Sequence, residues 1–121
     1  MIHHLTLVVT DLGKAKAFYA AALAPLGYEV LAESEGGLGL GADNHPDLWL
    51  KQDPANVHPM HLAFAAPSRK AVTAFHAAAL AAGARDNGGP GLRPDYDPTY
   101  YAAFVLDGDG HNIEAVILRP E

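Results

Sequence analysis

The chain has no cysteine among its 121 residues. This absence excludes a disulfide framework, a thiolate metal site and a cysteine nucleophile, so any metal must be held by histidine, aspartate or glutamate. The sequence also lacks an apolar run of the roughly 20 residues that a membrane helix needs, and it lacks the basic flank and apolar segment of a signal peptide. These absences predict a cytoplasmic protein that does not enter a membrane.

Positive charge is scarce as well. Eight lysines and arginines stand against fourteen aspartates and glutamates, which gives a net charge of −6, and no basic cluster occurs. Because nucleic-acid binding depends on basic side chains that contact phosphates, we expect no nucleic-acid partner. A hydrophobic content of 50% over a length typical of one domain predicts a single folded unit, residues 1–121, with a core of its own.

The order of the predicted strands and helices repeats once along the chain. Each half opens with an aliphatic strand and continues with a helix that a polar residue can cap, Thr10 or Asp11 in the first half and Ser68 in the second. Short strands follow in each half, at 28–33, 36–41 and 48–52 and then near 85, at 100–106 and at 112–118. The pattern predicts an α+β fold of two βαβββ modules, residues 1–56 and 57–121.

A direct comparison of the two halves supports a duplication. "AFYAAALA" at 17–24 matches "AFHAAALA" at 74–81, and His4 matches His61 at the same offset of 57 residues. Side chains alternate between the two faces of a strand, and the bulky apolar residues that follow each histidine should pack under the helices. His4 and His61 are therefore expected on the opposite face, where two modules could form a cleft.

Glu114 is the third polar residue in an otherwise apolar strand. Burial of a lone carboxylate is costly unless it is paired or coordinates a metal. Two imidazoles and a carboxylate from three strands could form a facial site for Mn, Fe, Ni, Co or Zn. Each residue also has an ordinary explanation: His4 as a surface residue, His61 satisfied by a backbone carbonyl, and Glu114 solvated on an edge strand. Because the repeat links the two histidines, we favour the metal site.

The segment "NGGPGLRPDYDPTYY" at 87–101 has the length and the glycine and proline content of a binding loop. Arg93 could hold an anionic group of a small-molecule substrate. The aromatic side chains that could line a pocket, or equally be packed for stability, are those of Trp49, Tyr96, Tyr100 and Tyr101. Of these we favour Tyr101, because it lies on the strand that precedes Glu114.

Two glycine-rich motifs and four further histidines are expected to play no direct role. "GLGLGA" at 37–42 should be a strand or bend, because no helix follows it. "DGDGHN" at 107–112 should be a turn, because the twelfth position of a calcium loop is here Leu118 and not glutamate. The remaining histidines are expected on the surface: His45, His58, His76 and His111.

Three segments carry a family resemblance: "HHLTLVVTDLGKAKAFYAAALAPLGYEVL", "HLAFAAPSRKAVTAFHAAALAAGA" and "YYAAFVLDGDGHNIEAV". They resemble the vicinal oxygen chelate superfamily, which contains glyoxalases, bleomycin resistance proteins and extradiol dioxygenases, and the resemblance covers nearly the whole chain from Met1 to Leu118. It implies two βαβββ modules that form a curved mixed sheet around a cleft, commonly within a homodimer. It also implies a divalent metal whose ligands fall on His4, His61 and Glu114.

The sequence departs from glyoxalase I-like members at one ligand. Those members take a further ligand from the last strand of the first module, here "DLWLKQ" at 47–52, where Trp49 and Lys51 lie near the position and Gln52 is the one plausible substitute. The resemblance implies a metal-dependent lyase, isomerase or dioxygenase acting on a small substrate with vicinal oxygens. Since a carboxylate at the metal could leave it and act as a base, Glu114 is a candidate for both ligand and catalytic base. The alternatives are a metal-free protein like those of bleomycin resistance, which sequesters an aromatic drug or metabolite, and a structural or regulatory module.

Overall fold

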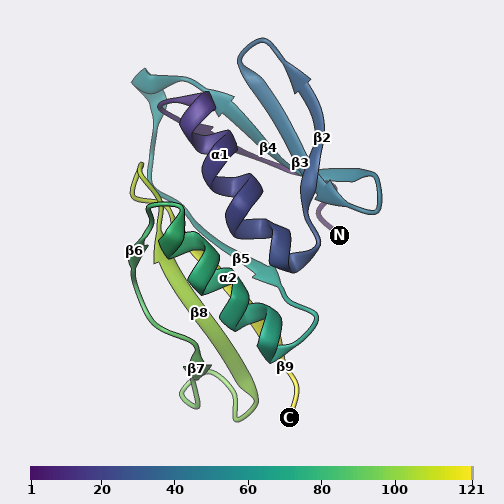
Figure 1. Cartoon of the computed structure of the whole chain (residues 1–121), viewed down its shortest axis with the longest axis vertical. Coiled ribbons are helices and arrows are strands. Elements are labelled where there is room, and N and C mark those ends of the chain that lie inside the picture. Colours follow the sequence, from purple (N-terminus) through teal and green to yellow (C-terminus); the bar gives the residue numbers. More distant parts are fainter. Residues whose placement is uncertain (121) are drawn as a thin grey trace.

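The computed structural model describes residues 1–120, and each half of the chain forms its own mixed sheet (Figure 1). The α+β class is confirmed, while hydrogen bonding divides the strands into two sheets in place of one continuous sheet. In the first half, the sheet order is β1-β4-β3-β2. The elements of this half are β1 (Leu5–Val9), α1 (Leu12–Leu23), the 3₁₀ turn η1 (Ala24–Leu26), β2 (Glu29–Ser34), β3 (Gly37–Ala42) and β4 (His45–Gln52).

The second half repeats this plan after a short 3₁₀ turn, η2 (Pro54–Asn56). Its sheet order is β5-β9-β8-β6, and one additional two-residue strand, β7, pairs with β8. The elements are β5 (His61–Ala65), α2 (Arg69–Ala81), β6 (Arg85–Asp86), β7 (Gly91–Leu92), β8 (Tyr100–Leu106) and β9 (Asn112–Leu118). In both halves the first strand pairs in parallel with the last, β1 with β4 and β5 with β9.

Local chemistry explains where the helices begin and how β3 turns into β4. The Asp11 carboxylate accepts a hydrogen bond from the Lys14 N–H at 3.0 Å, and the Ser68 hydroxyl accepts one from the Ala71 N–H at 3.0 Å, so each helix has the polar cap that the sequence predicted. Between β3 and β4, Asp43 and Asn44 have φ angles of 54° and 60°. Asparagine and aspartate tolerate this conformation, which a tight hairpin turn requires.

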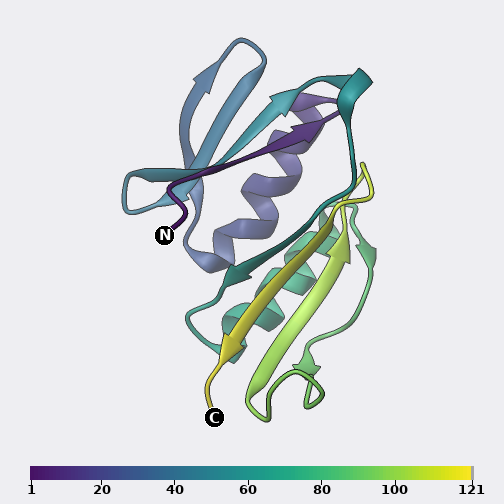
Figure 2. The ribbon, with the colours of Figure 1, turned by 180° about the vertical axis from the view of Figure 1, so that it is seen from behind.

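Both helices lie on the same side of the sheets and contact each other (Figures 1 and 2). Under them, Leu7, Val9 and Ile113 from the strands are fully buried with Phe75 of α2. Seen from behind in Figure 2, no helix covers the other face of the strands described in residues 1–120. Neither helix in this part of the chain is long and apolar enough to cross a membrane.

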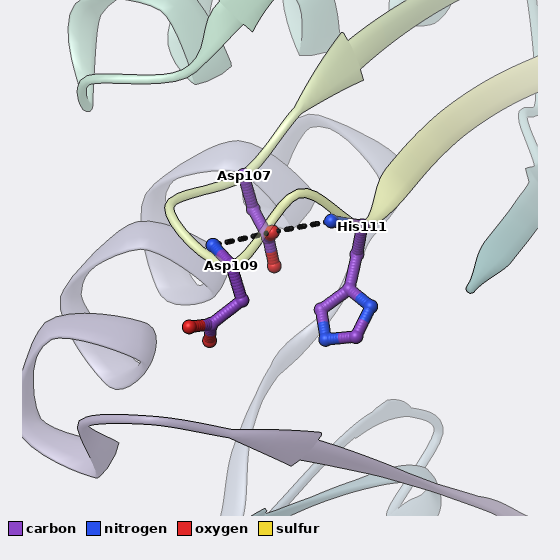
Figure 3. A group of neighbouring side chains, drawn as sticks. All are labelled: Asp107, Asp109 and His111. Carbon is purple, nitrogen blue, oxygen red and sulfur yellow. Dashed lines mark hydrogen bonds between the residues drawn. The ribbon is translucent and has the colours of Figure 1, made fainter. Parts of the chain in front are cut away.

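The β8–β9 turn, residues 107–111, joins the two modules (Figure 3). His111, which we expected on the surface, is 0% exposed. Its Nδ1 accepts a hydrogen bond from the Met60 N–H at 3.0 Å, and its Nε2 lies 2.9 Å from the Val8 carbonyl of β1. A carbonyl can only accept, so this network assigns the proton to Nε2 of a neutral ring. The surface prediction was wrong because turn residues around His111 do not reveal that the turn folds back onto β1.

Asp107 fixes the same turn from inside. Its Oδ1 accepts hydrogen bonds from the N–H groups of Asp109 and His111, at 3.0 and 2.8 Å, which are the dashed lines in Figure 3. Its Oδ2 accepts a hydrogen bond from the Tyr19 phenol of α1. Burial, together with the adjacent Asp107 carboxylate, raises the pKa of Tyr19 far above its usual range. A neutral tyrosine and a neutral histidine therefore connect this turn to the first module.

We call the hydrogen bonds of His111 and Asp107 at this turn the structural joint. They predict that substitution of His111 strongly lowers stability. His111→Ala leaves the Met60 N–H and the Val8 carbonyl without partners and opens a cavity, so we expect the free energy of unfolding to fall by about 3 kcal/mol. Urea denaturation followed by circular dichroism measures the change. His58→Ala, at an exposed histidine, is the matched control and should stay within about 0.5 kcal/mol of the unmodified protein. Equal effects of the two substitutions would contradict the structural role of His111.

Candidate functional site

Glu114 lies in the middle of the uncovered face of the second sheet, and it is nevertheless only 1% exposed. On β9 it is in register with Ala63 of β5 and Phe104 of β8. His61 Nε2 lies 2.7 Å from Glu114 Oε1, and the Tyr100 hydroxyl donates a hydrogen bond to Oε2. The structure therefore brings together two of the three predicted metal ligands, together with one predicted substrate-binding tyrosine.

The three groups differ in how they meet solvent. The His61 side chain is 54% exposed while that of Glu114 is 1% exposed, so the imidazole stands between the carboxylate and water. Burial, followed by the hydrogen bond to Glu114, raises the pKa of Tyr100 to about 12. The phenol consequently keeps its proton at neutral pH and serves as a donor to the carboxylate. Both Glu114 oxygens thus have partners that reach them from the open side of the sheet.

Aromatic rings surround this carboxylate, and we call His61, Tyr96, Tyr100 and Phe104 the aromatic rim. Tyr96, which is 68% exposed, contacts Tyr100 edge to face with ring centroids 5.1 Å apart. The His61 and Phe104 centroids are 6.2 Å apart. Our sequence reasoning missed Phe104, although strict alternation along β8 places Tyr100 and Phe104 on the face of Glu114.

The same alternation puts Tyr101 on the other face, which is why the structure does not bring this favoured residue to Glu114. The Tyr101 hydroxyl lies 3.5 Å from Thr73 Oγ1 of α2, and the Arg69 guanidinium lies 4.9 Å from the centre of its ring. Tyr101 is therefore packed against the helix side of the sheet. Its place on the strand that precedes Glu114 was a poor guide, because neighbouring residues on a strand point in opposite directions.

Arg93 belongs to the 87–99 loop and holds that loop together. Its guanidinium donates hydrogen bonds to the carbonyls of Gly89 at 2.8 Å and Gly91 at 2.9 Å. It also lies 5.3 Å from the centre of the Phe104 ring. Arg93 thus connects the loop to the aromatic rim. Its hydrogen bonds to the loop occupy donors that an anionic group of a substrate would need.

His4 lies apart from the other two predicted ligands. It is exposed just before β1, with its Nδ1 2.8 Å from Nδ1 of His3. In both ribbon views β1 and β5 run in roughly opposite directions, so that His4 and His61 mark opposite ends of these two strands (Figures 1 and 2). Within residues 1–120, the one group of three potential ligands whose atoms lie within 4.8 Å of one another is Asp107, Asp109 and His111. A single copy of the chain therefore does not gather His4 with His61 and Glu114.

The Asp107, Asp109 and His111 group is compact, but its ligand atoms already have hydrogen-bond partners. Both oxygens of Asp107 and both ring nitrogens of His111 are bonded as described above. Asp109 Oδ2 accepts a hydrogen bond from the Thr10 N–H at 3.0 Å. A metal ion could bind here only by displacing the bonds that join the modules. The group is better explained as a structural joint.

The register of the first sheet identifies the counterpart of Glu114. Ala63 is two residues after His61 and pairs with Glu114, and Thr6 is two residues after His4 and pairs with Trp49. Trp49 therefore stands where the second module has its carboxylate. Its ring covers Gly39, where an added Cβ would lie 3.0 Å from the indole. Gln52, the proposed substitute ligand, instead accepts a hydrogen bond from the Leu12 N–H at 2.8 Å at the start of α1.

Comparisons with known proteins agree with this geometry. The family model of the Glyoxalase/Bleomycin resistance protein/Dioxygenase superfamily matches residues 1–115. A glyoxalase/bleomycin resistance protein from Albidiferax ferrireducens T118 has a similar structure, with a TM-score of 0.82 and 28% sequence identity over 93% of this chain and 95% of that one. No curated protein matches the chain.

Two more distant structures share the fold. A glyoxalase/bleomycin resistance protein/dioxygenase family enzyme from Burkholderia phytofirmans PsJN has a TM-score of 0.76 and 18% identity over 98% of both chains. A domain from Frankia sp. EAN1pec has a TM-score of 0.74 and 17% identity over 98% of both chains. The matched residues and the duplicated fold lead to one conclusion: the chain belongs to the glyoxalase/bleomycin resistance protein/dioxygenase superfamily.

Proposed function

We propose that the protein is a divalent-metal-dependent lyase, isomerase or dioxygenase that acts on a small substrate with two neighbouring oxygens. The contact of His61 Nε2 with Glu114 Oε1, at 2.7 Å, carries this proposal. An imidazole nitrogen and a carboxylate oxygen are ligand types that divalent transition metals prefer, and here they lie side by side on an uncovered face. A buried carboxylate with partners only on its open side is suited to exchange one of them for a cation.

The residues around Glu114 have separate tasks in this proposal. His61 and Glu114 would hold the metal, and a bound divalent ion would act as a Lewis acid on the two substrate oxygens. Tyr100 keeps its proton and orients Glu114 through Oε2. Glu114 is positioned to accept a proton from the substrate, as a general base must be. The aromatic rim provides apolar surface for the body of the substrate and excludes water from it.

The third ligand, His4, is proposed to come from a second copy of the chain. In one copy His4 is remote from His61, while the uncovered faces of both sheets leave room for another molecule. Large apolar side chains are exposed, including Ile2 at 81%, Leu92 at 47% and Leu118 at 56%. A symmetric homodimer in which the first module of one copy faces the second module of the other would cover such residues and complete two equivalent sites.

Metal binding tests the ligand set. Glu114→Gln and His61→Ala should each weaken the binding of Co²⁺ or Zn²⁺ to tag-free protein by at least about tenfold, because each removes a ligand. Isothermal titration calorimetry measures the affinity, and circular dichroism checks that the variants fold. Asp109→Asn and His58→Ala are the controls, and both should bind like the unmodified protein. If Asp109→Asn alone weakens binding, the metal lies at the β8–β9 turn and the proposed site is wrong.

Mixing of two variants tests the shared site. His4→Ala and Glu114→Gln each lack a ligand, but a mixed dimer contains one site with all ligands intact. After subunit exchange we expect about a quarter of the metal sites of the unmodified protein to return, because half of the dimers are mixed and each has one good site of two. A site contained within one chain would show no recovery. A protein that stays monomeric by analytical ultracentrifugation would also contradict the arrangement.

The counterpart position offers a gain-of-function test. Trp49→Glu places a carboxylate at the position equivalent to Glu114, so we expect metal affinity to increase about tenfold through one more charged ligand. Trp49→Leu removes the same ring from Gly39 without adding a ligand, and it serves as the matched control. Calorimetric titration of both variants compares them directly. Equal affinities for the two would show that Trp49 does not face the metal.

A second function is favoured by the aromatic rim, in which Tyr96 is 68% exposed. Exposed rings that contact each other edge to face form a surface on which a planar aromatic molecule can stack. In this alternative the protein binds an aromatic drug or metabolite without a metal. One titration distinguishes the two functions. If an aromatic ligand binds equally well in the presence of a chelator and to the Glu114→Gln variant, the result supports sequestration and contradicts the metal-dependent enzyme.

A further inference from the structure

A cavity of about 350 Å³ lies between the two modules. Leu5 and Leu48 line it from the first sheet, and Leu62 and Phe64 line it from the second. Among residues 1–120, its wall contains one charged side chain, Asp47, and no lysine, arginine or histidine. The proposed metal site does not use Asp47, and the family resemblance gives it no role. We call this space the inter-module cavity.

Asp47 has one oxygen with a partner and one without. Its Oδ2 accepts a hydrogen bond from the Tyr28 hydroxyl at 2.9 Å. Its Oδ1 is buried and has no hydrogen-bond partner within residues 1–120. Tyr28 cannot supply the missing bond, because its single hydroxyl proton already serves Oδ2. An unpaired buried carboxylate oxygen is costly and rare, so it requires an explanation.

A local irregularity of β4 directs Asp47 toward the inter-module cavity. Gly41 pairs with Pro46 while Leu40 pairs with Leu48, so Asp47 is an extra residue in a β-bulge. Such bulges change the direction of a side chain and are common next to binding sites. Without the bulge, Asp47 would share the face of Trp49 two residues later. The backbone thus places the carboxylate among apolar groups between the modules.

We propose that the inter-module cavity binds a small molecule that has an ammonium group and an apolar body. The ammonium supplies both a hydrogen-bond donor and the positive charge that Asp47 Oδ1 lacks. A neutral donor would supply the hydrogen bond alone, and an anionic ligand would repel the carboxylate. Tyr28 and Phe64 meet edge to face at 5.5 Å beside it, and aromatic rings attract cations. The volume suits a ligand at the small end of the usual range.

Ile2, which is 81% exposed and precedes β1, also lines the cavity. Since Oδ1 of Asp47 is closed to solvent, a ligand reaches it only when the side chains around it shift. Ala63 also lines the cavity, and on the adjacent strand it pairs with Glu114. The inter-module site is therefore separate from the proposed metal site but borders the same strand.

Two probes of the same shape test the proposal on the unmodified protein. Benzylammonium should bind at least about tenfold more tightly than benzyl alcohol, because both can donate a hydrogen bond to Asp47 but only the cation adds an ion pair. Calorimetry or NMR titration at neutral pH gives both affinities, and amide shifts at residues 62–65 locate the site. Equal affinities, or binding matched by sodium ions alone, would overturn the proposal.

Asp47→Asn should abolish the preference for benzylammonium, since it removes the charge while an amide oxygen remains for Tyr28. Asp43→Asn is the matched control: it is the same substitution at an exposed position of the same hairpin, where the positive φ suits asparagine. A loss of preference in Asp43→Asn as large as in Asp47→Asn would contradict the site. Glu114→Gln should leave benzylammonium binding unchanged, so failure of the metal proposal and failure of this one remain distinguishable.

Discussion

The buried ring of His111 is the contact on which the arrangement of the two modules depends. It joins the Met60 N–H at the start of the second module to the Val8 carbonyl of the first, and Asp107 adds the Tyr19 phenol of α1. In this arrangement both helices lie on one side and contact each other, and no helix within residues 1–120 covers the other face of either sheet. In it β1 and β5 also run in roughly opposite directions, so that one copy of the chain cannot bring its two strand histidines together (Figure 2).

Three carboxylates show how partner groups distinguish structure from chemistry. Asp107 receives its hydrogen bonds from groups inside the chain, which makes it part of the joint. Glu114 is also buried, but its partners His61 and Tyr100 reach it from the uncovered face. Asp47 retains an oxygen without a donor within residues 1–120. If closeness to other acidic groups were the only criterion for a metal site, Asp107 would be chosen. Its oxygens, however, already accept hydrogen bonds from within the chain.

Period-two alternation was sufficient to predict which faces His61 and Glu114 occupy, because strand geometry is local. The same rule, applied to β8, separates Tyr100 from Tyr101 and finds Phe104. His111 and Asp47 could not be found in this way. His111 is buried by a contact with Val8, 103 residues away in the chain, and Asp47 is redirected by a bulge that depends on pairing with β3. The burial of His111 depends on a long-range contact, and the direction of Asp47 depends on the register of the β3–β4 hairpin. Composition determines neither.

The two halves of the chain differ at the equivalent positions Trp49 and Glu114. The pairing of Thr6 with Trp49 matches that of Ala63 with Glu114, yet one module holds an indole over a glycine and the other a buried carboxylate. A carboxylate in both modules would place two like charges at equivalent positions of a closed site, which favours a strongly bound metal. With one carboxylate, the proposed metal site would have lower negative charge and more open coordination positions. If a metal binds there as proposed, this asymmetry would favour chemistry in which the substrate itself supplies ligands to the metal.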